Sequence, residues 1–232
     1  MAPSITKLVN MSLSEGIVPD SFKKAIVTPL IKKTSLPKND PKSYRPVSGL
    51  PFISKLVERV VVAQVTDHIS RQGLDTALQS AYKRLHSTET ALLHIKNEIQ
   101  VSLSKGIPSA LVLLDLSAAF DTIDHTTLLD RLRSTFGLSG RVLMWFRSYL
   151  SDRYQSVKVE SEISRPSLLQ YRVPQGSVLG SILFSLYTSP LANIISGYKD
   201  LKYHFYADDT QIYCHVTQTN AKSVLILPRL SS

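Results

Sequence analysis

The chain has 232 residues, of which 43% are hydrophobic and 19% are charged. This length and composition allow one sizeable domain or two closely packed subdomains, and they exclude intrinsic disorder for most of the chain. The formal net charge is +9. A charge of this sign favours a polyanionic partner, either nucleic acid or an anionic membrane surface, and a solvated basic surface without a partner is the alternative.

Cysteine content and hydropathy indicate the cellular environment that suits the chain. Cys214 is the only cysteine, so an intrachain disulfide and a cysteine-rich zinc site are both excluded. A reducing, intracellular environment fits this composition. Residues 1–16 lack the apolar core of a signal peptide, and no run of about 20 apolar residues could span a bilayer. We therefore expect no membrane partner.

The first half of the chain is predicted to contain a strand, a basic loop and two helices. Residues 25–31 have the pattern of a strand, and Pro29 within it favours an edge strand. Residues 36–45 are rich in Pro, Asn, Asp and Lys, which is typical of a loop. Apolar spacing predicts helices over 54–69 and 88–103. The apolar face expected for the second helix consists of Leu92, Ile95, Ile99 and Leu103.

In the second half, the continuous apolar run 110–114 predicts a strand buried on both faces, and this strand ends in Asp115. The elements expected after it are helices over 126–136 and 142–150, a strand over 155–159, a helix opened by 173–176, and two strands within 202–216. The last two strands join at Ala207, Asp208 and Asp209. This order predicts an α+β fold in which an antiparallel sheet carries helices on one side, of the split-βαβ kind.

Three carboxylates lie where the pattern suggests chemistry. Asp115 ends an apolar strand, and Asp208 and Asp209 lie at the tip of a predicted hairpin. Carboxylates beside an apolar strand are costly unless a cation offsets their desolvation and mutual repulsion, and hard oxygen ligands select Mg²⁺ or Mn²⁺. Two consecutive aspartates can share one site only where the backbone bends. The alternative is that Asp208 and Asp209 are simply turn formers.

Five segments, taken together, resemble the ordered motifs of reverse transcriptases. They are YRPVSGLPFISKLVERVV (44–61), QSAYKRLHSTETALL (79–93), LVLLDLSAAFDTIDH (111–125), VPQGSVLGSILFSLYTSPL (173–191) and FYADD (205–209). The similarity is greatest to enzymes of LINE-type, non-LTR retrotransposons and extends from about Gly16 to His215. The order and spacing of five motifs make a chance match implausible.

The resemblance implies the fingers and palm of a right-hand polymerase, with a ferredoxin-like antiparallel palm sheet backed by helices. It implies fingers and fingers–palm helices over 1–105, a palm over 106–216 and a tail of no assigned structure over 217–232. The reaction would be RNA-directed DNA synthesis from dNTP on an RNA template and a DNA primer, with two Mg²⁺ or Mn²⁺ ions. The metal ligands would be Asp115, Asp208 and Asp209, the last in a supporting role.

The resemblance also implies residues that bind the incoming nucleotide. Phe120 would lie under the sugar and exclude a 2′-hydroxyl, unless it is a core aromatic. The backbone of Leu116, Ser117, Ala118 and Ala119 would face the triphosphate. Gln175 and Gly176 would contact the nucleotide, unless they only start a helix. Arg45 would grip phosphates bidentately, with Lys32 and Lys33 as further candidates.

The sequence departs from the family pattern at several places. Arg172 and Ser181 stand where Gly and Pro are usual, and no thumb or later palm motif is visible. We therefore expect a truncated copy or a piece of a longer polyprotein. The alternatives are an inactive relic that at most binds nucleic acid, and an RNA-dependent RNA polymerase, which Phe120 disfavours. A nuclear location follows from the resemblance alone.

Overall fold

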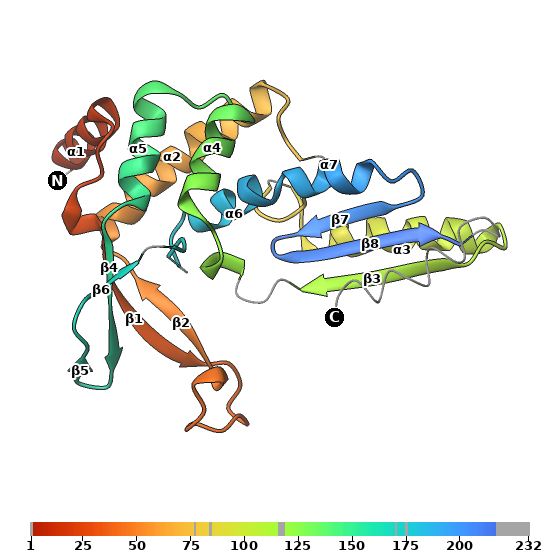
Figure 1. The fold of residues 1–232 in the computed structure, drawn as a ribbon, viewed down its shortest axis with the longest axis horizontal. Coiled ribbons are helices and arrows are strands. Elements are labelled where there is room, and N and C mark those ends of the chain that lie inside the picture. The colour runs from red at the N-terminus through yellow and green to blue at the C-terminus, as the bar shows by residue number, and fades with distance from the viewer. Residues whose placement is uncertain are drawn as a thin grey trace. The chain divides into compact units, whose positions relative to one another are not determined.

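A computed structural model describes residues 2–76, 78–83, 85–115, 119–169, 171–174 and 176–216. The chain forms two compact units (Figure 1). The first combines residues 1–74 with 120–186, and the second combines 75–119 with the chain from residue 187 onward. The units therefore interleave along the sequence, whereas the predicted fingers and palm were two consecutive blocks.

The first unit contains helices and a five-stranded sheet. Its helices are α1 (Ala2–Glu15), α2 (Phe52–Arg71), α4 (His125–Ser134), α5 (Gly140–Leu150) and most of α6 (Gly180–Thr188). Its strands are β1 (Lys24–Ile31), β2 (Tyr44–Gly49), β4 (Arg153–Val159), β5 (Glu162–Ile163) and β6 (Ser167–Leu169). The strand order is β2-β1-β4-β5, and β6 also pairs with β4. The predicted loop after β1 is confirmed up to the short 3-10 helix Pro41–Ser43, and Arg45 belongs to β2.

Strand β1 is not an edge strand, so that prediction was wrong. It lies between β2, to which it is antiparallel, and β4, to which it is parallel. The pairing with β4 covers only residues 24–27. Pro29 therefore lies where β1 pairs with β2 alone, directly opposite Pro46. Because two prolines have no N–H to exchange, this is a non-hydrogen-bonded pair, and Pro29 removes no bond between the two strands.

The core of the first unit gathers apolar side chains from its helices. Leu128 and Leu132 of α4 and Phe146 of α5 are fully buried, and Trp145 is 3% exposed. Helix α4 begins at an Asp124 N-cap, whose carboxylate accepts a 2.7 Å hydrogen bond from the backbone N–H of Thr127. The helices predicted over 54–69, 126–136 and 142–150 are confirmed here.

The second unit contains a three-stranded antiparallel sheet and two helices. The strands are β3 (Ser109–Asp115), β7 (Lys202–Tyr206) and β8 (Asp209–His215), in the order β3-β8-β7. The helices are α3 (Thr88–Ser104) and α7 (Pro190–Ser196). Ser87 caps α3 by accepting from the backbone N–H of Thr90, and Gly106 follows the helix with φ +74°. Residues next to the helix therefore define both of its ends.

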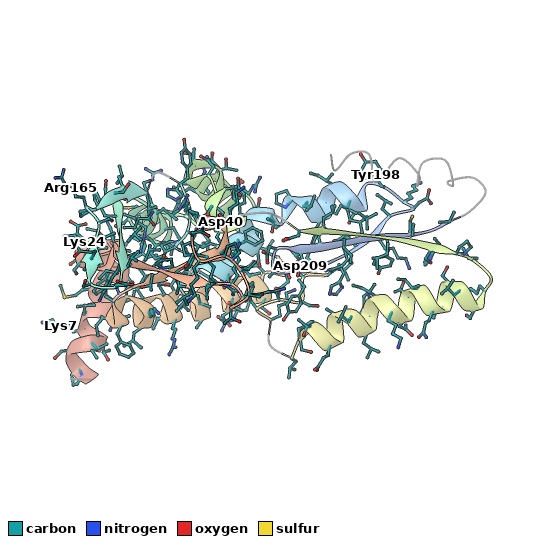
Figure 2. All side chains as sticks on the ribbon, turned by 90° about the horizontal axis from the view of Figure 1, so that it is seen from below. Lys7, Lys24, Asp40, Arg165, Tyr198 and Asp209 are labelled. Atoms are coloured by element: carbon teal, nitrogen blue, oxygen red, sulfur yellow. The ribbon has the colours of Figure 1, made fainter. Side chains whose placement is uncertain are left out.

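Helices cover both faces of this sheet, so the prediction of helices on one side was wrong. Tyr203 and Phe205 on one face of β7 join a buried apolar cluster with Ala192 and Ile195 of α7. His204 points to the other face, where its ring centroid lies 5.4 Å from that of His94 on α3. Neighbouring residues of a strand face opposite sides. Figure 2 accordingly shows α3 and α7 on opposite sides of the sheet.

Two expectations about burial in this unit were also wrong. Among the described strands, β3 lies at the edge of this sheet, and its Leu113 is 69% exposed rather than buried on both faces. Helix α3 buries Ala91 and Ile95, whereas Leu92 is 65% exposed. An apolar run or an apolar stripe identifies the element but cannot say which side other elements cover. Among the described helices, none is both long and apolar enough to cross a membrane.

Candidate active site

The turn between β7 and β8 contains two residues, Ala207 and Asp208. The predicted hairpin is confirmed, but Asp209 is the first residue of β8 and pairs with Tyr206 instead of lying in the turn. Ala207 has φ +57°, a left-handed conformation that primed two-residue turns require and that residues other than glycine adopt at a cost. Because the backbone bends at this turn, Asp208 and Asp209 do not have to point to opposite faces, as consecutive residues of a strand do.

Strand register brings Asp115 and Asp209 together across the sheet. Asp115 is the Cα partner of Asp209 and forms the last pair between β3 and β8. Directly opposite residues point to the same face, with Cβ atoms about 4.5–5.5 Å apart. The two carboxylates therefore lie on the face of the sheet that carries α3, at the end beside the turn. Figure 2 shows Asp209 at this end of the sheet.

The electrostatics of this end of the sheet are unfavourable without a cation. Burial raises the pKa of Asp209, and the negative charges of Asp208 and Asp115 raise it further. Each of these effects disfavours the ionised carboxylate. The donor set is all oxygen, which suits a hard divalent cation. Within the described ranges, no three or more His, Cys, Asp or Glu side chains are already grouped closely enough to hold a metal ion, so the three-ligand metal site stays a prediction.

Gly176 lies in the first unit against β2. It has φ +106°, and a Cβ atom there would lie 3.0 Å from the carbonyl oxygen of Ser48. Both the backbone conformation and this approach require glycine. Helix α6 begins at Gly180. The prediction that residues 173–176 open this helix was therefore wrong, and Gly176 precedes it. The segment packs against the strand that also carries Arg45, which is exposed.

Glu58 is a buried carboxylate that the sequence did not single out. It is 1% exposed and accepts hydrogen bonds from the backbone N–H groups of Val178, at 2.6 Å, and Leu179, at 3.1 Å. Ser54 donates a third bond at 3.2 Å. Burial, with the charge of Glu58, raises the pKa of Tyr149. A carboxylate from α2 thus fixes the segment between Gly176 and α6, complementing the N-terminus of that helix.

Phe120 is half-buried in the first unit. Its ring centroid lies 5.3 Å from that of Phe184 on α6, and its carbonyl accepts a 3.2 Å bond from Val173. These contacts attach Phe120 to the segment that contains Gly176. They are compatible with a packing role for the ring and with a ring edge that faces the nucleotide. The assignment of Phe120 as the residue that excludes a 2′-hydroxyl therefore stays a prediction.

Arg172 occupies a backbone conformation that favours glycine. Its φ is +90°, which gives a physical reason for the glycine that the family resemblance leads one to expect there. The side-chain Nε lies 3.6 Å from Asp121 Oδ1, and the two side chains are 44% and 35% exposed. The carbonyl of Arg172 lies 2.9 Å from Nε2 of His125. The arginine is therefore directed to Asp121 within the first unit.

The remaining predicted residues are distributed as follows. Leu116, Ser117, Ala118 and Gln175 lie outside the described residues, and Ala119 begins the 3-10 helix Ala119–Asp121. Asp115, Asp208 and Asp209 belong to the second unit, whereas Phe120, Gly176 and Arg45 belong to the first.

Residues 31–227 match the family model described as "Reverse transcriptase (RNA-dependent DNA polymerase)". The chain belongs to the reverse transcriptase family. This reverse transcriptase domain is 30% identical over 184 residues to a probable RNA-directed DNA polymerase from transposon BS of Drosophila melanogaster, covering 79% of the chain and 20% of the relative. It is 28% identical over 224 residues to the RNA-directed DNA polymerase from mobile element jockey of the same species, covering 94% and 23%.

The predicted assignment to non-LTR retrotransposon enzymes is therefore confirmed. The domain spans about a fifth of the length of the curated relatives it matches. Among solved structures, it is similar to apo telomerase from Candida tropicalis truncated from its C-terminal domain, with a TM-score of 0.64 and 13% identity. That match covers 93% of the domain and 48% of the telomerase chain. It supports the mixed α+β fold, which confirms the predicted class.

Proposed function

We propose that this reverse transcriptase domain catalyses RNA-directed DNA synthesis, in which a primer 3′-hydroxyl attacks the α-phosphate of a dNTP and pyrophosphate leaves. One observation carries the proposal. The register of β3 and β8 pairs Asp115 with Asp209, and Asp208 lies in the adjoining two-residue turn. Three carboxylates from segments far apart in sequence thus belong to one end of one sheet, in the family that performs this reaction.

Reverse transcriptases are generally dependent on divalent metal ions. In this domain, Asp115 and Asp208 would hold Mg²⁺ or Mn²⁺, with Asp209 in a supporting role. When bound, such ions activate the attacking hydroxyl and stabilise the leaving oxygens. The raised pKa of Asp209 supports the proposal, because the like charges that raise it are those a cation would offset.

Nucleotide selection is proposed for residues of the first unit and of the segment after β3. Phe120 would exclude a 2′-hydroxyl by its bulk, and Arg45 would bind phosphate oxygens. Gln175 and Gly176 would contact the incoming nucleotide, with the backbone of residues 116–119 facing the triphosphate. In this assignment β1 and β2 belong to the fingers, and the three-stranded sheet of the second unit belongs to the palm.

The proposed partners are an RNA template and a DNA primer. The net charge of +9 supports phosphate contacts. Candida telomerases with similar folds have been solved in complex with a fragment of telomeric RNA. Synthesis on chromosomal DNA, and hence a nuclear location, belongs to the same proposal.

Primer extension on an RNA template with dNTPs and Mg²⁺ tests the reaction. Asp208→Asn should abolish extension while circular dichroism shows an unchanged fold, because amide oxygens bind divalent cations more weakly than carboxylates do. Asp200→Asn removes an exposed acid near the start of β7 and is the matched control. If Asp208→Asn extends at the wild-type rate, the metal-ligand assignment is wrong.

An inactive relic that only binds nucleic acid is the alternative outcome. The extension assay is therefore repeated with a thumb domain appended, because a thumb would hold the primer–template duplex. If only the longer chain extends primers, the shorter chain fails because it does not retain the primer–template duplex. Absence of extension in both chains, with salt-dependent RNA binding intact, would favour the relic.

A further inference from the structure

The side-chain amide of Gln79 bonds to both backbone groups of Ala207. The backbone N–H of Ala207 donates to Gln79 Oε1 at 3.2 Å, and Gln79 Nε2 donates to the Ala207 carbonyl at 3.5 Å. The same Oε1 accepts from the backbone N–H of Ala81 at 3.0 Å. Gln79 is 5% exposed, and these bonds hold its side-chain amide in one orientation.

The backbone around Gln79 reaches the turn as a short extra strand. The N–H of Phe205 donates to the Leu78 carbonyl at 2.8 Å, and the N–H of Ser80 donates to the Phe205 carbonyl at 3.0 Å. These bonds form a parallel bridge between Gln79 and Phe205 on the outer edge of β7. Leu78 packs against the apolar cluster beneath α7. The backbone is therefore hydrogen-bonded to the sheet on both sides of Gln79, at Leu78 and at Ser80.

The turn needs such support because Ala207 is left-handed, with φ +57°. That conformation is disfavoured for an alanine, because its Cβ crowds the following carbonyl oxygen. A two-residue turn with a strained first position can relax, and any relaxation would move Asp208 and the start of β8. Bonds to both the N–H and the C=O of Ala207 favour the strained conformation over relaxed ones.

We propose that Gln79 is a positioning residue that fixes the β7–β8 turn, and with it Asp208 and Asp209, in the geometry that the polymerase reaction requires. This inference rests on the proposed function for its kinetic consequence. Glutamine suits the role because one planar group supplies both a donor and an acceptor. Glutamate would lose the donor and add a fourth carboxylate near Asp115, Asp208 and Asp209. Methionine has a similar length but lacks the amide.

The test compares Gln79→Met with the wild-type domain in two measurements. In hydrogen exchange, the Ala207 amide should exchange about fivefold faster in the variant, since one hydrogen bond contributes roughly 1 kcal/mol, while β8 amides distant from the turn keep their protection. In primer extension, kcat should fall about 10- to 100-fold with KM for dNTP within about twofold, because small misplacements of catalytic groups affect the chemical step. Gln79→Glu should lower kcat at least as much.

Ser80→Ala is the matched control. Ser80 is also 5% exposed, and its hydroxyl lies 2.9 Å from Nε2 of His204, which belongs to β7 and not to the turn. It should leave Ala207 exchange and kcat unchanged. Equal losses in Ser80→Ala and Gln79→Met would reduce Gln79 to a general packing role and overturn the proposal. Faster Ala207 exchange with an unchanged kcat would overturn it too.

Failure of the proposed function gives a different pattern. If the wild-type domain does not extend primers in any setting, Mn²⁺ binding measured by electron paramagnetic resonance replaces kcat. Weaker Mn²⁺ binding and faster Ala207 exchange in Gln79→Met, with both unchanged in Ser80→Ala, would support the positioning role. Unchanged Mn²⁺ binding would overturn it. If Gln79→Met does not fold, Gln79→Leu, which also lacks the amide, is compared with Ser80→Ala by the same measurements.

Discussion

Replacing Glu58 by leucine tests whether the buried carboxylate stabilises the segment before α6. Two effects oppose each other. Removing a buried charge relieves its desolvation, but it also leaves the N–H groups of Val178 and Leu179 without the acceptor at 2.6 Å and 3.1 Å. A hydrogen bond to a charged group contributes about 1.5–3 kcal/mol net of desolvation, so two such bonds give about 3–6 kcal/mol. Because Val178 is half-buried and can bond to water, we expect the lower end.

Glu58→Leu should therefore lower the free energy of unfolding by about 3 kcal/mol. For a chain of this size, that corresponds to a fall in Tm of about 6–12 °C. Glu58→Gln keeps an acceptor oxygen and should lie between the wild type and Glu58→Leu. Trp145 is the single tryptophan and is buried in the first unit, so its fluorescence during thermal or urea unfolding reports on this unit.

Glu162→Gln provides a control, because Glu162 is an exposed acid on β5 of the same unit. It should leave Tm unchanged. If Glu58→Leu proves as stable as the wild type, desolvation of the carboxylate outweighs its hydrogen bonds. The interpretation of Glu58 as a support for residues 176–180 would then be wrong.

Three further predictions follow from backbone geometry and burial. Arg172→Gly should be more stable than Arg172→Ala by about 1 kcal/mol in urea unfolding. Both variants lose the exposed ion pair, but only glycine accepts φ +90° without strain. Equal stability of the two variants would show that the backbone at this position is not strained. Gly176→Ala should destabilise by about 2 kcal/mol, and by more than Gly137→Ala, because both have positive φ but only at Gly176 would a Cβ meet a backbone oxygen, that of Ser48; equal losses would exclude that contact. Burial and nearby histidine charges lower the pKa of His204. The unfolded chain therefore binds its proton first, and Tm should fall as pH drops below about 6.5, the ordinary histidine value. His204→Gln should flatten that fall, and an unchanged slope in this variant would contradict the assignment.

Local chemistry in the sequence determined the elements and the candidate carboxylates. Ser87 supplies a hydroxyl cap and Gly106 accepts a positive φ. Each end of α3 therefore depends on residues within one helical turn of that end. The hairpin at Ala207 and Asp208 was likewise predicted from a short apolar–polar pattern. The order of the motifs led to the reverse transcriptase family, because each motif is a short segment that contains the residue types needed for the chemistry.

Tertiary structure alone decided which residues meet. The pairing of Asp115 with Asp209 depends on the register of β3 against β8, which neither strand contains by itself. The contacts of Glu58 with residue 178 and of Gln79 with residue 207 join segments more than a hundred residues apart. Exposure of Leu113 and Leu92 depends on which neighbours cover β3 and α3. Propensity and capping act within a few residues, whereas burial, register and support of a strained turn are set by packing across the fold.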